Sequence, residues 1–442
     1  MKKILIAISL LLLPFALFAA GSKETQETEP ITITWWHSNS GILQEATEEL
    51  ISSFNTTVGK EKGIKVEAIY QGKANDVLVK LKAVTADTDT SQYPDIVQLD
   101  ASGALDIVSS NIVTYTQDLA EKYNDDLSFL QENTKESLMY KDKLIGMPFN
   151  ASTILYYYNK TAFDEQNITP PSTIDELIQI APLLVLLDAK GNTTRYAFSN
   201  IPTTYELTAL LGSQNGVSYI TDMENGHQGT PTKTVFKENG TFKNLLTKWK
   251  KLYATGGLEN ASSGITASFV AGKTASFLAS TSNLTTIIQS VGNRFELGVA
   301  PCFRINENDK GGVNVGGGAL YAVTKDNSKQ EAAVWEFLKY ATSKEAQLKW
   351  HIKTGYLPVN KETYEMNEYK SFITQNPLFE VPAKQLFASN PKIVGVWIPS
   401  GYQIYYSFMS NIKKMLTDNI SVDATVNAMQ KEIDGYLKDY NV

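Results

Sequence analysis

Between residues 31 and 99 the sequence alternates strand-like and helix-like patterns, and this alternation restricts the fold more than any other feature. Segments 31–36, 64–70 and 95–99 are rich in β-branched and other apolar residues, as strands are. Segments 42–54 and 75–86 carry apolar residues at helical spacing. Strands that alternate with helices predict an α/β fold with a parallel, doubly wound sheet.

The segments that follow these strands are rich in polar residues. In an open α/β sheet, ligands bind beyond the carboxyl ends of the strands. We therefore expect Trp36, His37 and Asp100 to lie near a ligand. The predicted edge of the sheet consists of residues 37–41, 70–75 and 100–102.

The middle of the chain predicts a second lobe. A strand at 154–159 contains three consecutive tyrosines, of which Tyr157 is expected to be structural. Thr173, with Glu176 three residues later, forms the capping box of a following helix. A further strand at 274–278 and the segment 295–301 are expected to return to the first sheet. The predicted boundaries are 31–145 with about 285–345 for lobe 1, and about 146–284 with 346–442 for lobe 2.

The first residues have the pattern of an export signal. Lys2 and Lys3 precede an apolar run at 4–18, and small residues follow at 19–22. We predict a signal peptide at 1–21 and a polar tether at 22–30, with a retained membrane anchor as the alternative. A bacterial lipoprotein would have cysteine where Ser22 stands, so the mature protein is expected in the periplasm without lipid.

Composition excludes several classes of function. The 442 residues carry a net charge of −7, which argues against nucleic acid as a partner. Cys302 is the only cysteine, so an intramolecular disulfide and a cysteine-based zinc cluster are excluded. Arginine is scarce, which weakens any proposal of bidentate phosphate recognition. The 22 tyrosines offer flat apolar faces with one hydroxyl each, which suits sugars and polyols. We expect a monomer without metal or cofactor.

The histidines and the glycine run have plain structural interpretations. His227 lies in a loop and is expected to be solvated, whereas His351 is expected to hold a structural position in a helix. Gly316-Gly317-Gly318 lacks the Lys-Ser/Thr of a nucleotide-binding loop and precedes a strand. Close approach of the backbone to a ligand or to the other lobe explains the run better.

Five strings occur in an order that resembles the periplasmic extracellular solute-binding proteins of ABC importers, in the carbohydrate-type group. Within that group the chain is most similar to members that bind glycerol 3-phosphate, over about residues 31–437. The resemblance implies two lobes with a hinge and a ligand cleft between them, no catalysis, and permease subunits of the inner membrane as partners. The strings begin at Trp35, Pro148, Leu155, Gly316 and Trp350.

The resemblance also implies a site. Ser152, Ser280, Gly318 and Tyr356 match positions that contact the glycerol phosphate in those members. Their hydroxyl groups and the close backbone approach of a glycine suit that task.

Other positions depart from those members. Tyr405 stands where an arginine grips the phosphate, and we predict that it contacts the ligand. Ala74 stands where those members have a tyrosine, and Ala101 stands where they have a glutamate. Asp100, next to Ala101, could supply the missing carboxylate. Ile174 replaces a tryptophan that lines the cleft. A sugar, a polyol or a compound like glycerol 3-phosphate is therefore the expected solute.

Two other functions stay open at this stage. A secreted glycoside-acting enzyme needs two carboxylates on either side of one bond, and Asp100 has no evident partner. A carbohydrate-sensing surface protein could use the same fold.

Overall fold

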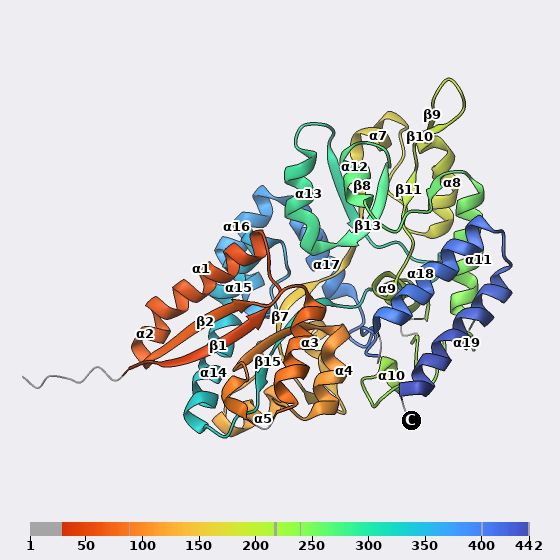
Figure 1. Ribbon diagram of the computed structural model, residues 1–442. Helices are drawn as coiled ribbons and strands as arrows, with labels where there is room; N and C mark the ends of the chain where they lie inside the picture. The colour runs from red at the N-terminus through yellow and green to blue at the C-terminus, as the bar shows by residue number, and fades with distance from the viewer. Residues whose placement is uncertain (1–28, 88, 216–218, 239, 399–400, 441–442) are drawn as a thin grey trace, which may run out of the picture.

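A computed structural model describes residues 29–440, apart from 88, 216–218, 239 and 399–400. The predicted signal peptide at 1–21, and the tether at 22–30 except for its last two residues, lie outside the described residues. Within the described part of the chain, no helix is both long and apolar enough to cross a membrane. Figure 1 shows two lobes, one at the lower left and one at the upper right.

Lobe 1 is built on a six-stranded sheet in the order β2-β1-β3-β15-β4, with β7 also paired to β15. The neighbours of β1 run parallel to it, as the alternating pattern predicts, whereas β15 is antiparallel to β3. The predicted α/β fold is therefore confirmed. The strands are β1 (Ile31–His37), β2 (Ile64–Tyr70), β3 (Ile96–Asp100), β4 (Val113–Thr114), β7 (Met147–Ser152) and β15 (Gly316–Val323).

Helices cover this sheet because each of them buries one apolar stripe. In α1 the buried side chains include Ala46, Leu50 and Phe54, at the spacing that predicted this helix. The helices packed in lobe 1 include α1 (Ile42–Thr56), α2 (Val58–Lys62), α3 (Ala74–Thr85), α4 (Ala101–Ser110), α5 (Thr116–Tyr123), α6 (Glu132–Glu136), α14 (Ser328–Ala341), α15 (Lys344–Thr354) and α16 (Asn367–Gln375).

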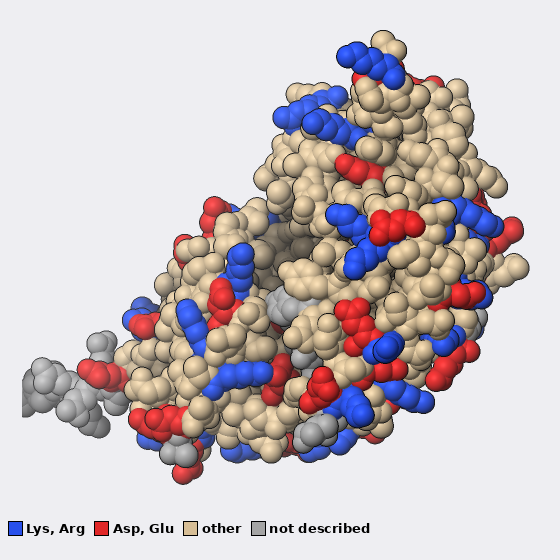
Figure 2. Space-filling model, turned by 45° about the vertical axis from the view of Figure 1, so that its right-hand side comes forward, with Lys and Arg blue, Asp and Glu red and all other residues tan. Residues whose placement is uncertain are grey.

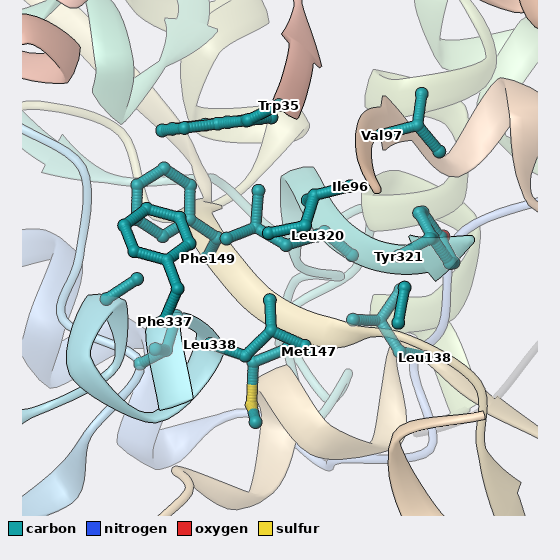
Figure 3. Packing of buried hydrophobic residues seen from close by; sticks show 14 of the residues in the cluster. Trp35, Ile96, Val97, Leu138, Met147, Phe149, Leu320, Tyr321, Phe337 and Leu338 are labelled. Carbon is teal, nitrogen blue, oxygen red and sulfur yellow. The ribbon is translucent and has the colours of Figure 1, made fainter. Parts of the chain in front are cut away.

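Large aromatic side chains fill the core of lobe 1. Trp35 packs against both Phe149 and Phe337, with ring centroids 5.6 and 5.8 Å from its own (Figure 3). These side chains come from β1, β7 and α14, so the core joins the start, middle and end of the lobe. Burial of each such side chain contributes about 1.5–3 kcal/mol.

Lobe 2 has its own five-stranded sheet, in the order β12-β11-β13-β8-β14. Its strands are β8 (Ile154–Asn159), β11 (Phe198–Ser199), β12 (Leu258–Glu259), β13 (Ser276–Ser280) and β14 (Leu297–Pro301). Its helices include α7 (Lys160–Glu165), α8 (Ile174–Leu184), α9 (Thr204–Asn215), α10 (Asp222–Asn225), α11 (Thr241–Ala254), α12 (Ile265–Val270), α13 (Leu284–Val291), α18 (Gly401–Thr417) and α19 (Val422–Tyr440).

Local features of lobe 2 agree with the sequence. The Thr173 hydroxyl accepts a hydrogen bond from the backbone N–H of Glu176 at 3.2 Å, so Thr173 caps α8 as predicted. Tyr157 is fully buried against Phe277 and is structural, also as predicted.

The predicted lobe boundaries differ from the observed sheets in three places. Lobe 2 is predicted to begin at about residue 146, but β7 pairs with β15 in the first sheet, so lobe 1 extends to Ser152. The strand predicted at 274–278 does not return to the first sheet, because β13 pairs with β8 in the second. Segment 295–301 does not return to the first sheet, because β14 pairs antiparallel with β8 in the second. The preceding helix α13 belongs to the same cluster of buried residues as β8 and β13, so it also lies in lobe 2. Conversely, α15 packs on α1 in lobe 1, although residues after 345 were assigned to lobe 2.

The described chain crosses between the lobes around Thr153, within 302–315 and within 389–398. The side chain of Gln385, in α17 (Glu380–Ala388), ties the first two together. Its Nε2 donates to the Thr153 hydroxyl at 3.1 Å, and its Oε1 accepts from the Cys302 backbone at 2.6 Å. Burial raises the pKa of the Cys302 thiol to about 12.

All three histidines are buried, and burial lowers the pKa of each to about 4. The prediction for His351 is confirmed: its Nδ1 lies 2.7 Å from the Tyr356 carbonyl, so this nitrogen carries the proton. The prediction for His227 is wrong. Its ring stacks on Trp397 at 3.9 Å, and its two nitrogens lie 2.8 and 3.0 Å from the carbonyl oxygens of Met139 and Gly395. The neutral ring donates one hydrogen bond, to either the carbonyl in β5 (Met139–Tyr140) or that in the third crossover, and lies in contact with both segments.

We predict that acidification destabilises the protein through these histidines. Between pH 6.5 and 4 the unfolded chain binds protons that the folded state does not, so the free energy of unfolding falls as the pH falls. From pH 7 to pH 5 each histidine contributes a loss of up to about 2 kcal/mol. Urea unfolding across this range measures the effect. His351→Gln should reduce the slope by about a third, and an unchanged slope would contradict the assignment.

Candidate ligand-binding site

A cavity of about 450 Å³ lies between the lobes and is lined by residues from both of them. Its size is typical of small-molecule sites. Figure 2 shows the hollow between the lobes, walled on this face mainly by uncharged residues. The polar residues of the lining are Ser38, Asn39, Gln98, Asp100, Asn150, Ser152, Thr204, Tyr205, Thr208, Ser280, Ser282, Asn314, Tyr356 and Tyr405.

The glycine run at the start of β15 forms part of the wall. Gly316 pairs with Ser152 on β7, and Gly318 pairs with Asp100 on β3. Gly317 has a φ of 110°, and a Cβ added there would lie 1.8 Å from the Asn150 carbonyl oxygen. Only glycine permits this contact, so the run brings the backbones of β15 and β7 together beside the cavity. Both strands belong to the lobe 1 sheet, so this contact is not with the other lobe. Close approach to a ligand stays a prediction.

Two tyrosines cover the cavity from opposite sides. Tyr205 comes from α9 in lobe 2, and its hydroxyl lies 3.3 Å from the Ser152 hydroxyl at the end of β7. Tyr356 follows α15 in lobe 1, where the Thr354 hydroxyl accepts its backbone N–H at 3.2 Å. Burial raises the pKa of both phenols, which therefore remain neutral hydrogen-bonding groups at physiological pH.

Ser280 stands at the end of β13, where lobe 2 faces the cavity. Its hydroxyl accepts from the backbone N–H of Ser282 at 3.3 Å and from the Ser282 hydroxyl at 3.0 Å. Both serines line the cavity. This end of the lobe 2 sheet therefore presents paired hydroxyl groups to a guest.

The structure brings most of the predicted site residues together. All but two of the eight line the one cavity, although they are far apart in the sequence. They are Asp100, Ser152, Ser280, Gly318, Tyr356 and Tyr405.

The structure does not bring Trp36 or His37 to the cavity. Trp36 is half-buried against the lobe 1 core. His37 is buried with its ring 5.5 Å from that of Trp35, and its Nδ1 accepts the backbone N–H of Asn39 at 3.1 Å. Asn39, two residues farther along, reaches the lining instead. Ile174, which matches a tryptophan of the resembling members, is fully buried in the lobe 2 core and does not line the cavity.

Sequence reasoning missed several lining residues. Tyr205 lies in a helix for which the sequence offers no functional motif. Asn150 lies inside one of the five strings that carry the resemblance, but it is not among the predicted site residues. Asn314 lies just before the glycine run. Proximity to matched residues is the one signal that could have identified these two asparagines.

No lysine, arginine or histidine belongs to the described lining of the cavity. Asp100 is the single carboxylate among those lining residues. A glycosidase needs two carboxylates across the bond that it cleaves, and this lining offers one. Across the described residues, no three His, Cys, Asp or Glu side chains gather in an arrangement that could hold a metal ion.

The sequence model of the bacterial extracellular solute-binding proteins matches residues 49–380. This chain belongs to that family. The solute-binding proteins of this family bind their solutes without transforming them, so the prediction that the chain is not an enzyme is confirmed. The family assignment also supports export from the cytoplasm.

Known members extend the comparison. The sn-glycerol-3-phosphate-binding periplasmic protein UgpB of Yersinia pseudotuberculosis is 26% identical over 369 residues, which cover 81% of each chain. The protein of that name from Escherichia coli O6:K15:H31 is 25% identical over 399 residues, 88% of this chain and 87% of the relative.

Solved structures of solute-binding proteins share the fold. UgpB from Mycobacterium tuberculosis in complex with glycerophosphocholine has a TM-score of 0.73 and 22% identity, over 94% of this chain and 99% of that one. The cyclic alpha-maltosyl-1,6-maltose binding protein from Arthrobacter globiformis has a TM-score of 0.76 and 19% identity, over 93% of this chain and 100% of that one. The predicted two-lobe fold is thereby confirmed.

We predict that Gly317→Ala lowers the free energy of unfolding by at least about 3 kcal/mol, because the new methyl group meets the Asn150 carbonyl. Gly272→Ala is the matched control: its φ is also positive, at 71°, but no atom lies within 4 Å of the added Cβ. The control should cost only about 1 kcal/mol. Chemical denaturation of both variants measures the difference, and equal losses would contradict the close contact.

Proposed function

We propose that this protein captures a small hydroxylated solute between its lobes and delivers it to the permease subunits of an ABC importer in the inner membrane. The observation that carries the proposal is one cavity, lined from both lobes and furnished with hydroxyl and carboxamide side chains, in a chain of the solute-binding family. The relatives whose names specify glycerol 3-phosphate, and the structural neighbours whose titles specify sugars, support a solute of this kind.

The proposed mechanism is closure of the lobes on the solute. Ser152 and Tyr356 come from lobe 1, whereas Tyr205 and Ser280 come from lobe 2. A solute that contacts both sets binds the closed arrangement more tightly than an open one, so it shifts the population toward closure. A permease can then distinguish loaded from empty protein by shape.

The location follows from the same proposal. The mature protein works in the periplasm as a monomer, is released by cleavage after residue 21, and carries no lipid at Ser22. It has no nucleic-acid partner and no cofactor, which accords with a net charge of −7 and with the lack of cationic side chains in the described cavity lining.

Thermal-shift screening of the mature protein against sugars, polyols, glycerol 3-phosphate and glycerophosphodiesters tests the proposal. A solute at 100 times its Kd should stabilise the protein by about 2.7 kcal/mol. Aryl glycosides serve as a second test, because their turnover would show an enzyme and end the transport proposal. A carbohydrate sensor would bind solute but would not stimulate an ABC permease in vesicles.

We predict that Tyr356→Ala weakens solute binding about 10-fold or more, because the ring and hydroxyl of Tyr356 lie on the cavity wall. The variant should still fold, since the residue is only partly buried. Tyr440→Ala is the matched control, because Tyr440 is 43% exposed at the end of α19. Calorimetric titration measures both variants. If Tyr356→Ala binds like the control, Tyr356 does not contact the solute.

A further inference from the structure

Two carboxamides on the cavity wall have unused hydrogen-bonding capacity. Asn150 is 7% exposed and Asn314 is 2% exposed, and the Oδ1 atoms of both have no hydrogen-bond partner among the described residues. Buried polar atoms are nearly always paired, so such exceptions require an explanation. Two other carboxamides of the same wall, Asn39 and Gln98, bond to each other at 3.0 and 3.3 Å. The wall therefore holds one satisfied pair and two unsatisfied groups.

The unsatisfied carboxamides lie where a guest would meet them. Asn150 belongs to β7, two residues before Ser152, and Asn314 ends the second crossover just before β15. A carboxamide both donates and accepts hydrogen bonds, and so does a hydroxyl group. A polyhydroxylated solute satisfies both asparagines, whereas a solute without hydroxyl groups leaves them unpaired at a cost.

Carboxylates offset the positive ends of the helices that begin at this cavity. A helix N-terminus carries about half a positive charge and attracts anions. At α3 the Asp76 carboxylate accepts the Lys73 backbone N–H at 2.8 Å, and at α9 the Glu206 carboxylate accepts the Thr203 backbone N–H at 2.9 Å. Asp100 immediately precedes α4.

This arrangement disfavours a phosphate. The described lining contains no cationic side chain, and carboxylates already stand at three of the helix ends that an anion would use. Burying a phosphate without a cation carries a large desolvation cost. Helix α18 also begins at the cavity, and its first turn contains no acidic residue. The phosphate esters in the experiment below test whether this helix end binds an anion.

A cationic solute is also disfavoured. The Asp76 and Glu206 carboxylates are engaged by backbone N–H groups, and Asp100 is the single carboxylate among the described lining residues. We propose that the cavity selects an uncharged polyhydroxylated solute over its phosphate ester, and that Asn150 and Asn314 recognise its hydroxyl groups. This inference rests on the proposed function and names the class of solute that the same site takes.

Calorimetric titration of the mature protein with matched compounds tests the charge selection. Glucose, trehalose and glycerol are each compared with a phosphate monoester of the same compound, and choline serves as the cationic probe. The expected result is that a neutral compound binds and that its phosphate ester binds at least 10-fold more weakly. Tighter binding of a phosphate ester or of choline would overturn the inference and leave solute capture intact. A lack of binding by all three classes would instead refute the proposed function.

Alanine variants test the two asparagines with the neutral compound that binds best. Asn150→Ala and Asn314→Ala should each weaken binding about 3- to 10-fold, the effect of one lost hydrogen bond. The Tm of the ligand-free protein should not fall, because the amide oxygens form no bond that folding could lose.

Asn360→Ala is the matched control. The Asn360 side chain donates to the Thr342 carbonyl and accepts from the Glu362 backbone, both at 2.9 Å, outside the cavity lining. This variant should lower the Tm and preserve the affinity. If Asn150→Ala and Asn314→Ala behave like the control, the two asparagines are structural and the inference fails.

Discussion

The contact between the backbone of Gly317 and the carbonyl of Asn150 is the constraint on which the cavity depends. Because no side chain fits at 317, β15 can pair with β7 on one side while it pairs with β3 on the other. One short glycine segment thus places Ser152, Asn150 and Asp100 around the same space. Asn150 and Ser152 belong to β7 and Asp100 belongs to β3. The strand that pairs with both, β15, comes from a third part of the chain.

The lobes are separate in their packing and joined by few covalent connections. Their principal clusters of buried residues draw on different sheets, and the crossovers are held by polar contacts such as those of Gln385 and His227. Moving one lobe relative to the other would leave both cores intact, which accords with the closure proposed for solute capture. Because the cavity is lined by both lobes, such a motion would change which residues contact a bound solute.

The sequence predicted the fold well where the signal is local. The strands and helices predicted between residues 31 and 100 occur within a residue or two of their expected bounds, because period and composition determine them. The short helix α2 was not predicted. Membership of a sheet is not local: nothing in segment 295–301 distinguishes pairing with β8 from pairing with β3. The burial of His227 likewise depends on Trp397, which is 170 positions away and belongs to the third crossover.

The site was predictable only in part, and for the same reason. Ser152, Ser280, Gly318 and Tyr356 came from the family resemblance, since no spacing rule links residues so far apart. Position at the end of a strand indicated Asp100, which lines the cavity, but it also indicated His37, whose ring is buried in the core and accepts the backbone N–H of Asn39. Successive side chains of a strand point to opposite faces of the sheet. A shift of one residue therefore decides whether a side chain at the strand end faces the cavity or the core.

The lone thiol at the second crossover has a practical consequence. Because Cys302 is partly covered and its pKa is raised to about 12, it stays protonated and poorly nucleophilic in neutral buffer. A cysteine introduced on the rim of the cleft is therefore the preferred target of a maleimide dye. The protein can be converted into a fluorescent reporter of its own solute without first removing any native residue.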